Sequence, residues 1–246
     1  MLAAHPSALS TSRILGRIAA VVVGVALITG IALSLRGPDL TYAPEMAASP
    51  VIMPDNRELF VQRYEVTIAE WNTCFAQGGC SMALRARPDQ DPDTVPATGL
   101  NYIDVQEYVR WMNAETRHDW RLPTSEEWAY MAEPVLPEEP DPIFTDPALS
   151  WASSYLVEGL VSRALRPQGS FATSPEGIED LNGSVWEWTN DCYSGVSDDG
   201  RCPAFYVGGE HVAAIPFLVR DPARGGCAVG SPPAHLGMRL VTERSL

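Results

Sequence analysis

One stretch of twelve residues, Gly177 to Trp188, constrains the fold of this chain more than any other segment. Its sequence, GIEDLNGSVWEW, brings two tryptophans, two glycines and three acidic residues close together. Tryptophans bury large apolar surfaces, glycine permits backbone conformations closed to other residues, and carboxylate and carbonyl oxygens are ligands for hard cations. The stretch therefore predicts a buried structural turn that also holds a cation.

The composition is that of a globular domain with short secondary-structure elements. Apolar residues make up 46% of the chain, and 21 prolines and 19 glycines interrupt it at many points. The formal net charge is −14, from 17 basic and 31 acidic residues. This charge disfavours nucleic acid and anionic membrane surfaces as partners of the globular part, so we interpret it as a solvated acidic exterior.

An uncharged apolar run over residues 18–35 follows Arg13 and Arg17. Its length is at the lower end for a membrane-spanning helix and exceeds the usual apolar core of a signal peptide. We expect an uncleaved signal anchor over residues 1–36, formed by one transmembrane helix with its amino terminus in the cytoplasm. The globular domain would then lie in the periplasm or another extracytoplasmic space. Cleavage near Ala47 and Ala48 is the alternative.

The rest of the chain is predicted to be one linker and one domain. Residues 37–58 form a short polar tract with several prolines and aspartates, which is typical of a linker. Residues 59–246 then form the globular domain.

Five cysteines fit an exported domain with two disulfides and one unpaired thiol. Five choices of the unpaired residue, each with three pairings of the others, leave fifteen schemes. We favour Cys74 with Cys80 and Cys192 with Cys202, because each pair flanks a turn-rich loop that a disulfide could close. Cys227 is then unpaired.

Local signals predict one strand and three helices. Residues 60–66 alternate as a strand does. Capping residues precede the helical patterns, and Arg121, just before the third helix, is expected to form a structural salt bridge. The predicted helices begin after Thr67, Asn101 and Thr124, and the second of them covers residues 102–115. Together these elements indicate an α+β domain with few helices, short strands and long loops.

Five blocks of the sequence, in this order, resemble the formylglycine-generating enzyme family, also called sulfatase-modifying factor domains. The resemblance covers about Leu59 to Val241. It implies a single domain of α+β class, distantly like C-type lectin folds, with little regular secondary structure. The blocks are YEVT at residues 64–67, the helix at 101–112, RLPTSEEW at 121–128, the stretch at 177–188, and RGG at 224–226 with GMRLV at 237–241.

The resemblance also implies a structural calcium site. The family's ligands carry over to Asp180 and Glu187 by side chain, and to Gly183 and Val185 by main-chain carbonyl. Ligation by oxygen alone from one tight loop suits calcium. The alternative is a turn in which Asp180 caps backbone donors and Glu187 is solvated. A second calcium site of the family needs an asparagine-containing segment that residues 151–174 lack, so it is not assigned.

Enzymes of this family oxidise a cysteine of a substrate polypeptide to formylglycine, using oxygen and copper(I) held by two cysteines in a Cys-x4-Cys pair. Here ten residues separate Gly226 from Gly237, and Cys227 is the single cysteine among them. One thiolate is a poor copper(I) site, so no copper is expected. Cys227 is the one candidate for a catalytic thiol, and a buried, unreactive cysteine is the alternative.

These observations favour an exported, membrane-tethered accessory or maturation factor that binds a polypeptide of an exported metalloenzyme. Proteins with this fold that occur beside copper nitrite reductases, enzymes of denitrification, are the members it resembles. Two other functions stay open. One is a formylglycine-generating oxidase that acts on a protein cysteine. The other is a calcium-dependent, lectin-like binder, prompted by residues 188–191, which read WTND beside the predicted calcium loop.

Overall fold

A computed structural model of the 246-residue chain describes residues 38–136, 164–183, 185–193, 202–209, 212–221 and 235–246. The chain divides into two units, Met1–Pro38 and Asp39–Leu246, and the elements below belong to the second. In the stretches that the structure describes, no helix has both the length and the apolar character needed to cross a membrane. The transmembrane helix expected over residues 18–35 lies outside these stretches.

The three predicted helices are confirmed. They are α2 (Ile68–Ala76), α3 (Tyr102–Thr116) and α4 (Ser125–Ala132), and a short 3-10 helix, η1 (Leu40–Tyr42), precedes them. Each α-helix begins with a capping box, in which the side chains of the N-cap and N3 residues each accept a hydrogen bond from the other's backbone N–H. The three pairs are Thr67 with Glu70, Asn101 with Asp104, and Thr124 with Glu127.

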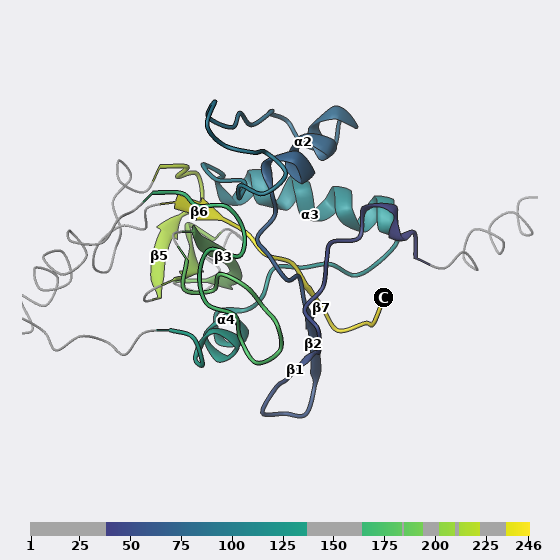
Figure 1. The fold of residues 1–246 in the computed structure, drawn as a ribbon, viewed down its shortest axis with the longest axis vertical. Coiled ribbons are helices and arrows are strands. Elements are labelled where there is room, and N and C mark those ends of the chain that lie inside the picture. The colour runs from purple at the N-terminus through teal and green to yellow at the C-terminus, as the bar shows by residue number, and fades with distance from the viewer. Residues whose placement is uncertain (1–37, 137–163, 184, 194–201, 210–211, 222–234) are drawn as a thin grey trace, which may run out of the picture. The chain divides into compact units, whose positions relative to one another are not determined.

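Two small sheets complete the domain (Figure 1). The first is antiparallel, has the strand order β1-β2-β7, and consists of β1 (Val51–Ile52), β2 (Glu58–Val61) and β7 (Val241–Thr242). The second has the order β5-β4-β3-β6 and consists of β3 (Val185–Cys192), β4 (Ala204–Gly208), β5 (Ala213–Pro216) and β6 (His235–Gly237). Within it β3 runs antiparallel to β4 and parallel to β6. In Figure 1, α2 and α3 lie above this second sheet and α4 lies below it.

The start of the domain differs from the sequence prediction. The linker was predicted over residues 37–58, but residues 39–58 pack on the domain, since β1 pairs with β2 and Val51 and Met53 are buried. The strand predicted over residues 60–66 is instead β2, which starts and ends earlier. Both errors concern very short strands, since β1 has two residues and β2 has four, and strands of this length leave little periodic pattern in the sequence.

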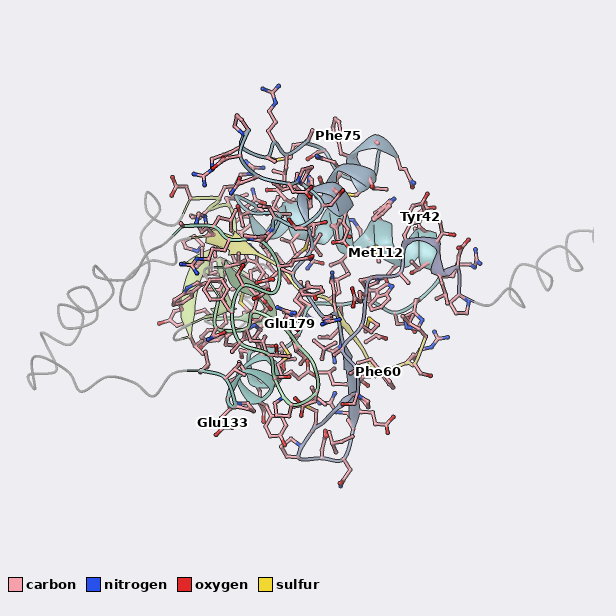
Figure 2. All side chains as sticks on the ribbon, viewed as in Figure 1. Tyr42, Phe60, Phe75, Met112, Glu133 and Glu179 are labelled. Atoms are coloured by element: carbon pink, nitrogen blue, oxygen red, sulfur yellow. A yellow bond between two sulfur atoms is a disulfide. The ribbon has the colours of Figure 1, made fainter. Side chains whose placement is uncertain are left out.

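Tryptophans anchor two hydrophobic clusters. The larger cluster joins α2 and α3 to β3 and β4 through Trp71, Met112, Trp188 and Val207, among others. The smaller joins α4 to β1 and β2 through Trp128, Met131, Val51 and Leu59. In Figure 2, Met112 lies among the packed side chains, whereas Phe75 and Glu133 lie at the surface.

Gly208 on β4 shows how closely α4 approaches the sheet. A Cβ atom at this position would lie 2.1 Å from the ring of Trp128, which no real side chain could tolerate. Glycine is therefore required where β4 passes under the indole.

The predicted disulfides are confirmed. Cys74 bonds to Cys80, with their Cα atoms 5.4 Å apart, and Cys192 bonds to Cys202, with a Cα separation of 5.7 Å. The first bridge ties the end of α2 to the turn that follows it. Cys227 lies outside the described residues.

Candidate functional site

The loop that leads into β3 is hydrogen-bonded to the backbone of residues 169–172 through its own acidic and amide side chains. The Phe171 N–H donates to Asp180 Oδ1 at 2.8 Å, and the Gly169 N–H donates to Asp180 Oδ2 at 2.5 Å. Asn182 Oδ1 accepts from the Ala172 N–H at 3.0 Å. Asp180 also adopts a positive φ of 65°, which aspartate tolerates better than most residues. Its carboxylate thus caps backbone donors, as the alternative for this loop predicted, but the solvated Glu187 of that alternative is wrong because Glu187 is buried.

Glu187, on β3, is fully buried and bound by two donors from distant parts of the chain. Trp128 Nε1 donates to its Oε2 at 2.9 Å, and Arg239 Nη2 donates to its Oε1 at 2.9 Å. Arg239 is itself 0% exposed. The guanidinium also donates to the main-chain carbonyls of Gln62, Arg63 and Glu179. Arg239 therefore neutralises Glu187 and ties three chain segments together.

As arranged here, the four residues predicted to bind calcium do not form an open site. Each carboxylate oxygen of Asp180 and Glu187 already accepts a hydrogen bond, and Glu187 faces a positive charge. The Gly183 N–H donates to the Asp180 carbonyl, and Val185 starts β3. Among the described residues, no group of three or more His, Cys, Asp or Glu could hold a metal ion. Calcium at this loop stays a prediction.

Glu65 is a second buried carboxylate beside the same guanidinium. Its Oε2 lies 3.8 Å from Arg239 Nη2 and has no hydrogen-bond partner among the described residues. Burial raises the pKa of Glu65 to about 8, although the charge of Arg239 acts in the opposite direction. Because Glu187 already neutralises Arg239, burial favours the protonated form of Glu65. Sequence reasoning placed this residue in the YEVT block but did not identify its charge state, which depends on burial.

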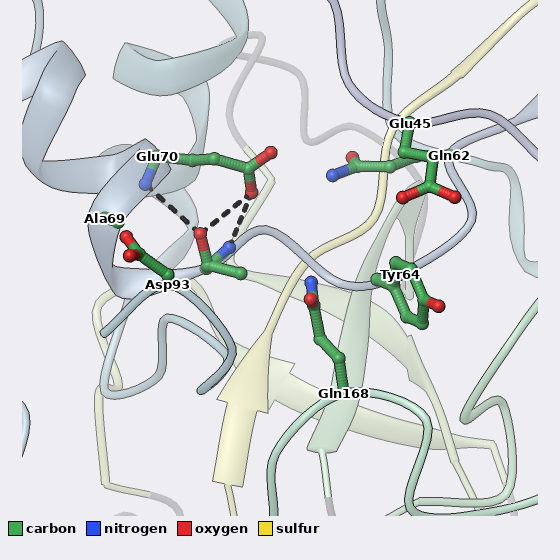
Figure 3. Close-up of a pocket in the computed structure, with 8 residues that line it drawn as sticks. Glu45, Gln62, Tyr64, Ala69, Glu70, Asp93 and Gln168 are labelled. Atoms are coloured by element: carbon green, nitrogen blue, oxygen red, sulfur yellow. Dashed lines mark hydrogen bonds between the residues drawn. The ribbon is translucent and has the colours of Figure 1, made fainter. Parts of the chain in front are cut away.

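Next to this cluster the chain forms a polar pocket with a volume of about 190 Å³ (Figure 3). It is lined by Glu45, Gln62, Tyr64, Thr67, Ala69, Glu70, Asp93 and Gln168. Three of these side chains are carboxylates, and no lining residue is basic. Sequence reasoning missed the pocket, because its residues come from four separate segments of the chain.

The carboxylates of the pocket differ in their partners. Glu45 pairs with Arg63 at 2.6 Å. Glu70 Oε2 accepts from the Thr67 N–H at 2.8 Å as part of the capping box, and burial raises the pKa of Glu70. Neither Glu70 nor Asp93 has an ion-pair partner in the part of the chain that the structure describes. The pocket thus retains negative charge.

Gln62 adds an unused hydrogen-bond donor to the pocket. Its side chain is 2% exposed, and its Oε1 accepts from the Leu240 N–H at 3.1 Å. The Nε2 group makes no hydrogen bond within the described residues, and Figure 3 shows it pointing into the pocket.

Other candidate residues from the sequence serve the fold. Arg121 forms the expected salt bridge, a two-pronged contact with Glu127 at 2.6 and 2.8 Å. Burial opposes ionisation of Glu127, but the hydrogen bonds from Arg121 and from the Thr124 N–H outweigh it and lower the pKa of Glu127 to about 2. This pair therefore stabilises the start of α4.

The residues that suggested a lectin-like function also have partners within the domain. Asn190 Oδ1 accepts from the Tyr102 hydroxyl at 3.0 Å. Asp191 Oδ2 accepts from the N–H and the hydroxyl of Ser125, each at 2.7 Å. These contacts join β3 to α3 and α4.

The domain, with few helices, two small sheets and a buried arginine at their junction, has an architecture of the formylglycine-generating enzyme type. The sequence matches the family described as Sulfatase-modifying factor enzyme 1-like domain over residues 33–244. This match spans most of the chain, so the protein belongs to that family.

Comparison with solved structures finds several that are similar to this chain. PvdO from Pseudomonas aeruginosa is similar with a TM-score of 0.51 and 19% sequence identity, covering 80% of this chain and 89% of that one. CarF gives a TM-score of 0.45 at 18% identity, with 75% and 85% of the two chains covered. Treponema denticola variable protein 1 gives 0.43 at 14%, with 81% and 93% covered. No curated protein sequence matches this chain.

Proposed function

We propose that this protein is an exported, membrane-tethered accessory or maturation factor, without catalytic activity, that binds a polypeptide of an exported metalloenzyme. One observation carries the proposal. The family domain spans residues 33–244, but only ten residues separate Gly226 from Gly237, and they contain one cysteine. A scaffold that keeps its core and lacks the copper-binding pair is suited to binding a polypeptide rather than oxidising one.

Two further features support the export of the domain. Four of its five cysteines pair in disulfides, which persist in oxidising compartments. The apolar run over residues 18–35 has the length and the basic flank of a signal anchor. A metalloenzyme of denitrification is the partner class that the resemblance favours.

The composition of the chain suggests a sharp test for the partner. All 17 basic residues are arginine, so the chain contains no lysine. A carbodiimide joins carboxylates to amines without a spacer. In the native membrane fraction it would join carboxylates of this chain to lysines of a bound partner, and no lysine of the chain itself could compete.

We expect mass spectrometry to identify such crosslinks to one exported protein. We also expect a strain without this protein to release that enzyme with a reduced metal content. Loss of the crosslinks in the presence of excess purified, uncrosslinked protein is the control for specificity. If no exported protein is crosslinked above the level of a strain that lacks the chain, the proposal is wrong.

A second candidate function rests on Cys227, the one cysteine outside the two disulfides. A formylglycine-generating oxidase would convert the cysteine of a substrate peptide and lower its mass. Mass spectrometry of a cysteine-containing peptide after incubation with the protein, oxygen and copper(I) tests this function. An unchanged peptide mass, with Cys227→Ser indistinguishable from wild type, eliminates the thiol mechanism.

A further inference from the structure

We infer that the pocket between Gln62 and Asp93 recognises a basic residue of a polypeptide, with the cationic side chain facing Glu70 and Asp93. The inference deepens the proposed function, because it rests on that function for the presence of a polypeptide ligand. It adds the chemical class that the ligand must present and the residues that select it.

The first argument is the charge of the pocket. Of its three carboxylates, Glu45 is paired with Arg63, whereas Glu70 and Asp93 have no basic partner among the described residues. Glu70 is half-buried, and one oxygen of its carboxylate is fixed by the capping box of α2. A carboxylate held in place and partly shielded from water interacts more strongly with a cation than an exposed one does.

The second argument is the amide of Gln62. Its Nε2 group faces the pocket and has no hydrogen-bond partner among the described residues, so it can donate to an acceptor that enters the pocket. The Leu240 N–H holds the other end of the amide, so the Nε2 group stays directed into the pocket. A main-chain carbonyl of the ligand supplies the acceptor. A polypeptide carrying a basic side chain presents both groups together, which an inorganic cation does not.

The third argument is size. At about 190 Å³ the pocket is smaller than the sites that enclose drug-sized ligands, and it suits one extended side chain. Tyr64 forms one wall, and its ring supplies an apolar surface for the methylene stem of lysine or arginine. Recognition of one side chain together with its backbone therefore uses the two carboxylates, the Gln62 amide and the Tyr64 ring together.

Binding of short peptides to the full-length protein in detergent tests the inference. The probes are fluorescent, capped pentapeptides of glycine with lysine, arginine or glutamine at the centre. We expect the lysine and arginine peptides to bind roughly tenfold more tightly than the glutamine peptide, as one favourable ion pair in a partly shielded site would give. The double variant Glu70→Gln, Asp93→Asn should lose this preference.

Glu70→Gln is chosen because glutamine also serves in a capping box, so α2 keeps its start. Glu115→Gln is the matched control, since it removes one charge from an exposed position on α3 outside the pocket. Equal affinity for basic and neutral peptides, or an equal loss of preference in Glu115→Gln, would overturn the inference.

Carbodiimide coupling of the lysine peptide gives a measurement that needs no variant. Because the chain has no lysine, each amide formed with a lysine identifies a carboxylate next to the bound peptide. We expect the crosslinks at Glu70 or Asp93, and crosslinks spread over the acidic surface contradict the inference.

If basic peptides bind here and no exported partner is found, the accessory function fails alone. If a partner is found and the pocket shows no preference for basic residues, this inference fails alone.

Discussion

Glu65→Gln removes a buried carboxylate whose Oε2 has no hydrogen-bond partner among the described residues, and it should make the folded domain more stable at neutral pH. Burial raises the pKa of Glu65 from 4.5 to about 8 in the folded protein. Between these two values the folded state holds a proton that the unfolded state releases. The wild-type free energy of unfolding therefore falls as pH rises, by about 1.36 kcal/mol per pH unit from this group. From pH 4.5 to pH 7 the loss amounts to about 3 kcal/mol.

Glutamine has the shape of the protonated side chain and cannot release a proton in this range, so its contribution is independent of pH. Urea denaturation of both proteins, followed by tryptophan fluorescence, measures the difference in free energy of unfolding at several pH values. We expect this difference to grow in favour of Glu65→Gln from pH 5 to pH 8. Glu58→Gln, which changes an exposed glutamate on β2, should follow the wild type. A difference between Glu65→Gln and wild type that does not change with pH would refute the reasoning.

Three further perturbations probe the rest of the domain. Arg239→Met leaves Glu187 buried without a counter-charge and should lower the free energy of unfolding by about 3–5 kcal/mol, measured by urea denaturation; an unchanged midpoint would contradict the pairing. Replacing Cys74 and Cys80 by serine opens a short loop and should lower the free energy of unfolding by about 2 kcal/mol, which is measured as a lower Tm. An unchanged Tm would contradict the disulfide. Calcium should leave the Tm of the wild type equal to that in EGTA, because the carboxylates of the predicted calcium loop are already satisfied. A Tm that rises with calcium concentration would instead establish the site that the sequence predicts.

The helices could be predicted from the sequence because their signals are local. Each begins with a capping pair three residues apart, and each carries apolar residues at helical spacing. The disulfides were predictable for a similar reason, since each closes a loop of ten residues or fewer between its cysteines.

The candidate site depends on pairings that the sequence does not encode locally. Arg239 meets Glu187 from 52 residues away and Glu65 from much further, in a chain with 31 acidic residues. The resemblance directed attention to Asp180 and Glu187 as ligands of a cation. In the structure the cation beside Glu187 is an arginine side chain, and no pattern in the chain marks that choice.

The buried cluster and the pocket share one chain segment, and this makes Arg239 a positioning residue for the pocket. The guanidinium holds the carbonyls of Gln62 and Arg63, while the side chains of Gln62 and Tyr64 line the pocket. Arg63 in turn pairs with Glu45 on another wall. The arginine of the GMRLV block thus fixes two walls of the pocket from within the core. A substitution that keeps the fold but weakens the hydrogen bonds of Arg239 to these carbonyls should reduce the preference for basic peptides, although it changes no residue that lines the pocket.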